Sequence, residues 1–294
     1  MEHVIYIPLP DMTKGGYAYI PVLDRLNISH SFKLEESTAV LPLTDKSTYI
    51  LADHQRFMPK SSLDVILNRD LLFKTGIPTI PTRLLTVDEQ ASEGYLKKPR
   101  NSAIGGEYVI MPDLGLGIQD LDISFSVNSN GEIYPFLELN ITYGGYKQPM
   151  AIEMSKEDNS VTLDFLQSAV TSLSIRGGIH NAQFLKYNNV WSLVDWNPRP
   201  IYFLTEHVGD TYSLLEEPLL FMLDQPIPKT KWYYRSKGFY TVPIPANKAS
   251  DIKDLGLIPR RGGGATMFNR VNGISRTQEA LDYKFQQLEN ILAS

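Results

Sequence analysis

The chain has 294 residues, 43% of them hydrophobic and 21% charged, and its formal net charge at pH 7 is −5. This composition is that of an ordinary globular protein, long enough for one large domain or two to three smaller ones. The negative charge gives no electrostatic reason to expect a polyanionic partner, and the absence of cysteine excludes disulfides, thiolate nucleophiles and cysteine-bound zinc.

The first 60 residues alternate short strand-like runs with one helical pattern. Strands are expected at 4–7, 31–34, 39–43 and 49–51, with a short apolar helix after Gly15 and Gly16. This alternation predicts a small α/β layer. The Gly15-Gly16 loop lies where a strand leads into a helix, which is a common ligand position, although a plain turn is the simpler explanation.

The middle of the chain carries one helix and then mostly strand signals. Ser61 and Ser62 can cap a helix that ends at Gly76, and strands are expected up to Pro99 and at 108–111, on either side of a polar loop. Residues 123–127 alternate strictly and turn at 128–131 into a second strand, which is a hairpin signature. A helix is expected at 162–175, followed by a second hairpin that turns at 188–189.

The remainder is less regular from about residue 206. It contains a stretch at 260–264, Arg-Arg-Gly-Gly-Gly, that is typical of a mobile loop, and a final amphipathic helix at 277–292. The N-terminus lacks a basic segment followed by a long apolar run, and nothing approaches the ~20 apolar residues of a membrane span. We therefore expect a cytoplasmic protein without membrane association.

Three polar residues follow the second hairpin at alternate positions: Asp195, Asn197 and Arg199. Because alternate side chains of a strand share one face, the oxygens of Asp195 and Asn197 can hold a hard divalent cation, and Gln183 on the preceding strand is a third candidate ligand. The planar guanidinium of Arg199 suits a phosphate. The alternative is that these residues mark only a strand end and a solvated turn.

The strand register decides between these interpretations. A two-residue turn at Asn188-Asn189 pairs Gln183 with Val194 and directs it to the wrong face. A three-residue loop, or one bulge, pairs Gln183 with Asp195. The metal hypothesis therefore predicts a loop with an odd number of residues.

The order of these motifs resembles the ATP-grasp ligases, which include the carbamoyl-phosphate synthases and biotin carboxylases. The resemblance covers roughly residues 61–210 and lies in Asn68-Arg69-Asp70 with the following Thr75-Gly76-Ile77-Pro78-Thr79, Leu96-Lys97-Lys98-Pro99 with its glycine loop, residues 110–122, Asn181-Ala-Gln183-Phe, and Asp195-x-Asn197-Pro-Arg199 followed by Thr205-Glu206. Two departures concern the metal site: Asp195 stands where the family has Glu, and Gln183 is neutral.

The resemblance implies an α/β (α+β) chain with an ATP-grasp fold and a preceding α/β domain. The expected division is 1–60 for the preceding domain, 61–112 for the N-terminal ATP-grasp subdomain with its lid, 113–210 for the C-terminal subdomain, and 211–294 for a C-terminal extension.

The activity implied is that of an ATP-dependent carboxylate–amine ligase that forms an amide through an acyl phosphate, with ATP and Mg²⁺ as cofactors. The alternative is an ATP-grasp-like module that binds nucleotide without turnover. Small-molecule carboxylate and amine substrates are the expected partners; nucleic acid is disfavoured, and a homo-oligomer is compatible with the sequence.

The resemblance also implies a set of site residues. Arg69 and Lys98 correspond to the phosphate-binding cations, Gly105 and Gly106 to the lid, Met111 to the adenine-binding hinge, Asp113 to the ribose ligand and Asp120 to the strand after the hinge. Gln183, Asp195 and Asn197 correspond to the Mg²⁺ ligands, and Arg199 to a catalytic arginine that neutralises charge on the transferred group. Arg176, outside the family motifs, is a second candidate catalytic arginine as a plausible substrate contact. The five histidines show no zinc-binding spacing, and for His180 a structural hydrogen-bonding role is favoured over substrate contact.

Overall fold

The computed structural model describes residues 4–6, 16–36, 39–40, 75–80, 83–85, 95–99, 108–112, 119–145, 148–199, 213–228, 232–238, 244–261 and 268–294. The strand expected at 49–51 and the helix expected after Ser61 lie outside them. The chain divides into two compact units, the first comprising 1–115, 122–138 and 157–227 and the second 116–121, 139–156 and 228–294.

The first unit begins with the expected α/β layer. Strands β1 (Val4–Tyr6), β2 (Ser29–Ser31) and β3 (Ala39–Val40) form a parallel sheet in the order β2-β1-β3, accompanied by α1 (Gly16–Arg25) and the 3-10 turn η2 (Leu34–Glu36). Ile5, Val22 and Leu23 are fully buried in a core that also contains Leu215 and Leu219. Parallel strands need a covering layer, and α1 and α7 provide it.

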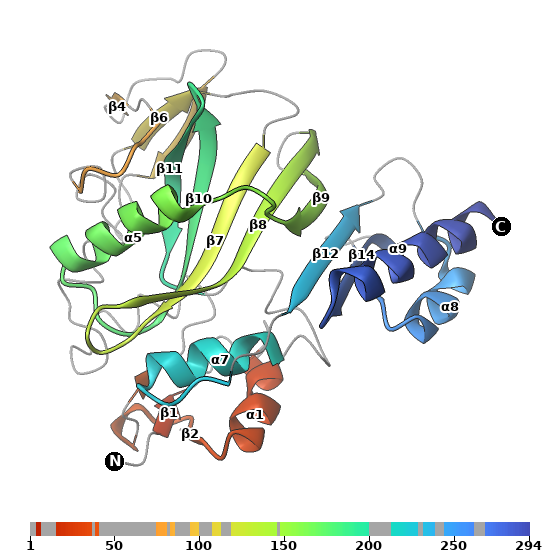
Figure 1. Ribbon diagram of the computed structural model, residues 1–294, viewed down its shortest axis with the longest axis horizontal. Coiled ribbons are helices and arrows are strands. Elements are labelled where there is room, and N and C mark those ends of the chain that lie inside the picture. The colour runs from red at the N-terminus through yellow and green to blue at the C-terminus, as the bar shows by residue number, and fades with distance from the viewer. Residues whose placement is uncertain are drawn as a thin grey trace. The chain divides into compact units, whose positions relative to one another are not determined.

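Helix α7 (Ser213–Met222) lies beside α1 in Figure 1, in the stretch where the sequence indicated irregular structure. Pro218 lies inside this helix. Because an internal proline ordinarily ends a helical pattern, the local signal was weak, whereas burial of the leucines on either side favours the helix in the folded chain.

Two further sheets of the first unit carry the predicted site residues. Strands β4 (Arg83–Leu85), β6 (Tyr108–Pro112) and β5 (Tyr95–Pro99) form an antiparallel sheet in the order β4-β6-β5. The larger sheet has the order β11-β10-β7-β8 here, with β7 (Gln119–Val127), β8 (Ile133–Gly145), β10 (Ile179–Tyr187) and β11 (Val190–Asn197). Helix α5 (Ser160–Ser172) is close to the range expected from its spacing.

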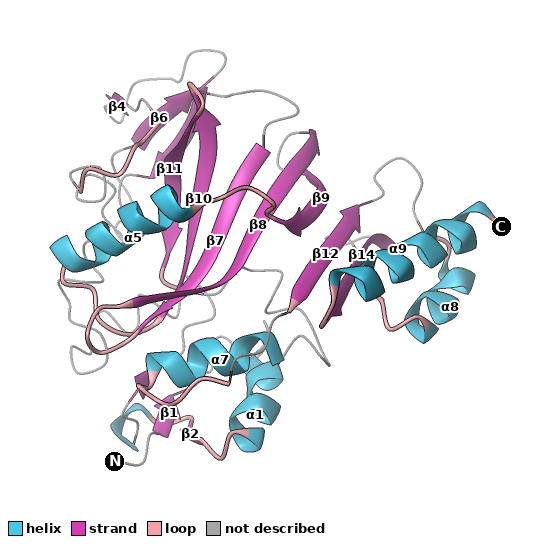
Figure 2. Cartoon of the chain, viewed as in Figure 1, coloured by secondary structure: helices cyan, strands magenta, loops and turns pink. Residues whose placement is uncertain are grey.

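The second unit continues from residue 139 of β8. Its strand order is β8-β9-β12-β14-β13, with β9 (Gln148–Met154), β12 (Tyr233–Gly238), β13 (Ile258–Arg261) and β14 (Phe268–Ser275). Its helical elements are η4 (Ala246–Lys248), α8 (Ala249–Asp254) and α9 (Gln278–Ala293), as Figure 2 shows. Arg260 and Arg261, expected in a mobile loop, instead end β13 and pair with β14. The main-chain pairing that orders them leaves no local pattern in the sequence.

The final helix α9 confirms the expected amphipathic segment at the end of the chain. Thr277 caps it by accepting a hydrogen bond from the backbone N–H of Ala280 at 3.2 Å. Leu281, Phe285 and Leu288 are buried against Val271 of β14. None of the helices in the described ranges is long and apolar enough to cross a bilayer.

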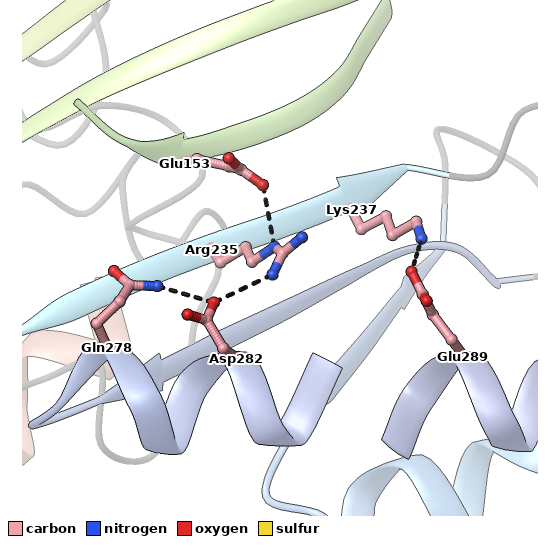
Figure 3. A network of polar contacts seen from close by, with 6 residues as sticks. All are labelled: Glu153, Arg235, Lys237, Gln278, Asp282 and Glu289. Atoms are coloured by element: carbon pink, nitrogen blue, oxygen red, sulfur yellow. Dashed lines mark hydrogen bonds and ion pairs between the residues drawn. The ribbon is translucent and has the colours of Figure 1, made fainter. Parts of the chain in front are cut away.

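Ion pairs link α9 to β12 at the edge of this core (Figure 3). Arg235 forms ion pairs with Glu153 of β9, at 3.1 Å, and with Asp282 of α9, at 3.3 Å, while its guanidinium lies 4.7 Å from the centre of the Phe285 ring. Lys237, two residues along β12, pairs with Glu289 at 2.6 Å. Since these groups are partly exposed, each pair contributes little alone, and the network chiefly orients the helix.

Gly273 is the position at which α9 approaches the sheet most closely. A Cβ atom at Gly273 would lie 2.6 Å from Leu257, 2.8 Å from Phe285 and 3.0 Å from Leu281. We therefore expect Gly273→Val to lower the free energy of unfolding by about 1–3 kcal/mol, the usual cost of overpacking a core. Urea denaturation measures this. Exposed Glu279→Gln on the same helix is the control, and equal stability of the two variants would contradict the close approach.

Candidate functional site

The β10–β11 hairpin brings the predicted metal ligands together. Its turn has two residues, Asn188 and Asn189, both with positive φ (49° and 62°) as a type I′ turn requires. A bulge between Gln183 and Phe184 then shifts the register, so that Gln183 pairs with Asp195. The odd-numbered loop was therefore wrong, and the alternative of one bulge is confirmed.

Strand β7 extends this arrangement on the other side of β10. The backbone N–H of Val127 donates to the carbonyl of Gly178 at 2.9 Å, and Nδ2 of Asn181 donates to Oγ of Ser124 at 3.4 Å. These contacts define an antiparallel register in which Ser124 faces Asn181. Continued by two residues, the same register places Asp122 opposite Gln183.

Two rows of polar side chains therefore cross three neighbouring strands on one face. We call Asp122, Gln183 and Asp195 the acid row, and Ser124, Asn181 and Asn197, with Asn181 paired to Asn197, the amide row. Successive positions of β7 show the two-faced character: Asp120, Asp122, Ser124 and Ser126 alternate with Leu121, Ile123, Phe125 and Val127, and all eight are buried.

Burial of so many polar groups on one face carries a free-energy cost unless protein or ligand atoms satisfy them. Asp122 is 5% exposed, Ser124 1% and Asn181 4%. Asp120 was predicted as a cofactor-binding residue, whereas Asp122, Ser124 and Asn181 were missed. The alternation of polar residues through 120–126 contained the signal, since it places all of them on the face of Asp120.

The oxygen donors of Gln183 and Asp195 in the acid row, together with Asn197 of the amide row, fit a hard cation. Asp195 supplies carboxylate oxygens, and Gln183 and Asn197 supply amide oxygens, which are ligands that Mg²⁺ accepts while retaining waters and phosphate oxygens. Within the described ranges, no group of three or more acids and histidines gathers closely enough to hold a metal by itself.

Arg199 lies at the end of the same face. Its Nη2 is 3.5 Å from Oδ1 of Asn197, and it is only half-buried. Arg176, the other predicted catalytic arginine, lies at the β7–β8 turn, where Nη1 donates to the carbonyl of Ile175 at 2.8 Å and the guanidinium packs against Gly131. This contact supports the turn, and a catalytic role for Arg176 stays a prediction.

The remaining predicted residues fall on β5 and β6 or outside the described ranges. Lys98 pairs with Val109 and Leu96 pairs with Met111, so Lys98 and Met111 lie two positions apart in the β5–β6 register. The other predicted nucleotide-binding residues lie outside the described ranges: Arg69, Gly105, Gly106 and Asp113. Their roles stay predictions.

A buried aromatic cluster supports the site from the opposite face of the sheet. His180 is fully buried, stacked on Phe125 with ring centres 5.4 Å apart, and it receives the indole N–H of Trp196 at 3.4 Å. Its other nitrogen, Nε2, lies 3.0 Å from the carbonyl of Gly177. A neutral imidazole protonated on Nε2 satisfies both partners, whereas the imidazolium would leave two donors facing each other.

Burial lowers the pKa of His180 from 6.5 to about 4, and the hydrogen bond to the Gly177 carbonyl only partly opposes this effect. The structural role expected from the sequence is consistent with these contacts. Trp196 lies between Asp195 and Asn197 in the chain, so the cluster holds the back of the strand that carries both oxygen ligands.

This burial makes stability depend on pH. Below pH 6.5 the unfolded chain protonates His180, while the folded chain resists protonation until about pH 4. As the pH falls through this window, we expect the free energy of unfolding to decrease by about 3 kcal/mol from this residue alone. Urea unfolding of wild type and His180→Gln between pH 7 and 4 isolates the effect; identical pH dependences in the two proteins would contradict it.

Comparisons with known proteins identify the fold. No protein-family model matches the sequence, and no curated protein matches it in sequence. Solved structures match over nearly the whole chain. The N5-carboxyaminoimidazole ribonucleotide synthetase from Thermus thermophilus is 12% identical with a TM-score of 0.68, covering 98% of this chain and 97% of its own.

Two further structures give the same result. N5-carboxyaminoimidazole synthase from Aspergillus clavatus, in complex with ADP and 5-aminoimidazole ribonucleotide, is 11% identical with a TM-score of 0.68 and coverages of 100% and 99%. L-amino acid ligase from Bacillus licheniformis is 11% identical with a TM-score of 0.61 and coverages of 96% and 85%. The chain therefore has the ATP-grasp fold, which confirms the fold expected from its motifs.

Proposed function

We propose that this protein is an ATP-dependent carboxylate–amine ligase. The observation that carries the proposal is the bulged pairing of Gln183 with Asp195, which lines up oxygen-bearing side chains on one polar face of a chain with the ATP-grasp fold. Three of the similar structures are complexes with ADP or ATP, which supports ATP as the cofactor. Sequence identities of 11% and 12% to these structures leave the substrate to be found by experiment.

In this proposal the nucleotide lies with its phosphates toward the acid row. Lys98 and Arg69 hold the phosphates, Gly105 and Gly106 cover them, and Met111 and Asp113 bind the adenine and the ribose. Bound Mg²⁺ neutralises phosphate charge and orients the γ-phosphoryl group. Gln183, Asp195 and Asn197 hold it in place, and Asp120 and Asp122 lie on the same face of the neighbouring strand.

The reaction transfers the γ-phosphoryl group to a carboxylate. A carboxylate oxygen bonds to the phosphorus, the bond to the bridging oxygen breaks, and ADP leaves with the electron pair. An amine then attacks the acyl phosphate and displaces phosphate, which gives the amide. Arg199, at the edge of the amide row, neutralises charge on the transferred group, since such reactions depend mainly on positioning and charge.

The cation ligands include one formal negative charge, that of Asp195. We therefore expect Mg²⁺ alone to bind weakly, and Mg²⁺ with a non-hydrolysable ATP analogue to raise the melting temperature by several degrees more than the sum of the separate effects. Differential scanning fluorimetry with Mg²⁺, the analogue, and both together tests this. Equal stabilisation by Mg²⁺ with and without nucleotide would contradict a shared site.

Asp195→Asn tests catalysis directly, because it removes that charge without changing side-chain size. We expect ADP release in the presence of bicarbonate or an amino acid, with ammonia as the amine, to fall on the order of 100-fold. Exposed Asp158→Asn is the matched control and should retain full activity. Unchanged turnover in Asp195→Asn would exclude the ligase assignment.

The same assay separates the second candidate, a nucleotide-binding module without turnover. Arg199 donates to Asn197 Oδ1 within the protein, so one candidate ligand oxygen is already in use. If nucleotide stabilises the wild-type protein but no carboxylate and amine mixture releases ADP, the binding module is the better assignment.

A further inference from the structure

The amide row has unused hydrogen-bonding capacity. A carboxamide can take part in four hydrogen bonds, two as donor and two as acceptor. Within the described ranges, the Asn181 side chain makes one, the 3.4 Å bond to Ser124, although it is 4% exposed. Farther along β7, Oγ of Ser126 is fully buried with no partner in the described part of the chain. Buried groups with spare capacity point to a ligand.

The free groups beside Asn181 include two hydrogen-bond donors as well as the amide oxygen of Asn181 itself. Ser124 already accepts from Asn181, so its hydroxyl hydrogen is available, and Asn181 retains a second N–H. Arg199 adds positive charge from the Asn197 side, at 3.5 Å from its amide oxygen. Asp122 and Asp195 belong to the acid row, two positions along their strands and about 6–7 Å away. The local chemistry of the amide row therefore favours an anion.

We propose that Ser124 and Asn181 form the subsite for the carboxylate of the acid substrate, and that Asn181 is a specificity-determining residue. This inference rests on the proposed ligase function. Nδ2 of Asn181 and Oγ of Ser124 donate to one carboxylate oxygen, which leaves the other directed along the sheet toward the acid row. That oxygen is the one that bonds to the γ-phosphorus as ADP departs, and no proton moves in this step.

The position of the subsite explains why the two rows differ in chemistry. A carboxylate placed in the acid row would meet Asp122 and Asp195, and like charges at that distance in a buried site are strongly unfavourable. In the amide row, two residues along each strand, the carboxylate meets a hydroxyl and amides, which bind it by hydrogen bonds without protonating it. The carboxylate therefore keeps its nucleophilic charge, and the cation ligands remain available for the nucleotide.

Asn181→Asp is the decisive variant because it is isosteric and replaces a donor by a negative charge. We expect KM for the carboxylate that stimulates ADP release, taken from bicarbonate and the amino acids, to rise at least about 10-fold, since a charge-assisted hydrogen bond is replaced by repulsion. The concentration of Mg·ATP at half-saturation should change less than about 2-fold, because Gln183, Asp195 and Asn197 are themselves unchanged. The matched control is Asn130→Asp, an asparagine in the exposed β7–β8 turn.

Ser124→Ala supplies an independent test should Asn181→Asp fail to fold; it removes one donor and should raise the same KM about 5-fold. A selective rise in KM for the carboxylate in either variant supports the subsite. Equal weakening of Mg·ATP, or loss of kcat with KM for the carboxylate unchanged, overturns it while the ligase function stands. Absence of stimulated ADP release in the wild-type protein overturns the proposed function, and this inference with it.

Discussion

The site depends on one register shift in β10–β11. With its two-residue turn, a regular ladder would place Gln183 opposite Val194, and the bulge restores Asp195 as its partner. A bulge leaves part of the ladder unpaired, so it needs support from elsewhere. The segment 75–80 supplies it: the carbonyl of Pro78 accepts the backbone N–H of Leu193 at 2.7 Å, and Ile80 packs against Val194. The chemistry of the site thus rests on a contact with a segment more than one hundred residues earlier.

The two faces of the sheet carry different sets of buried polar side chains. On one face, the carboxylates and hydroxyls of β7 and the amide of Asn181 are buried, whereas on the opposite face His180 accepts the indole N–H of Trp196 and lies within hydrogen-bond distance of the carbonyl of Gly177. A satisfied buried polar cluster rigidifies its surroundings. The aromatic cluster therefore holds in place the strands that carry the candidate ligands on the other face.

The N-terminal α/β layer is joined to this sheet through the acidic residues of α7. Glu216 pairs with Arg25 of α1 at 2.5 Å, and the buried Glu217 accepts a hydrogen bond from Tyr134 of β8, also at 2.5 Å. Burial and the neighbouring Glu217 carboxyl raise the pKa of Tyr134, so the phenol remains a donor at any physiological pH. A helix without a clear sequence signal thus holds the layer and the sheet together.

Local patterns in the sequence were sufficient for α5, α9 and the two hairpins, because periodicity, caps and turn residues act over a few positions. Alternation along one strand also put Asp195 and Asn197 on one face as candidate ligands, a role that stays a prediction. The register that pairs Gln183 with Asp195, helix α7 and strands β9 and β12–β14 were decided by tertiary structure. Strand pairing and burial depend on residues far apart in the chain. Pro218 lies in a helix and Arg260 in a strand because contacts with residues distant in sequence outweigh the local conformational preference at each position.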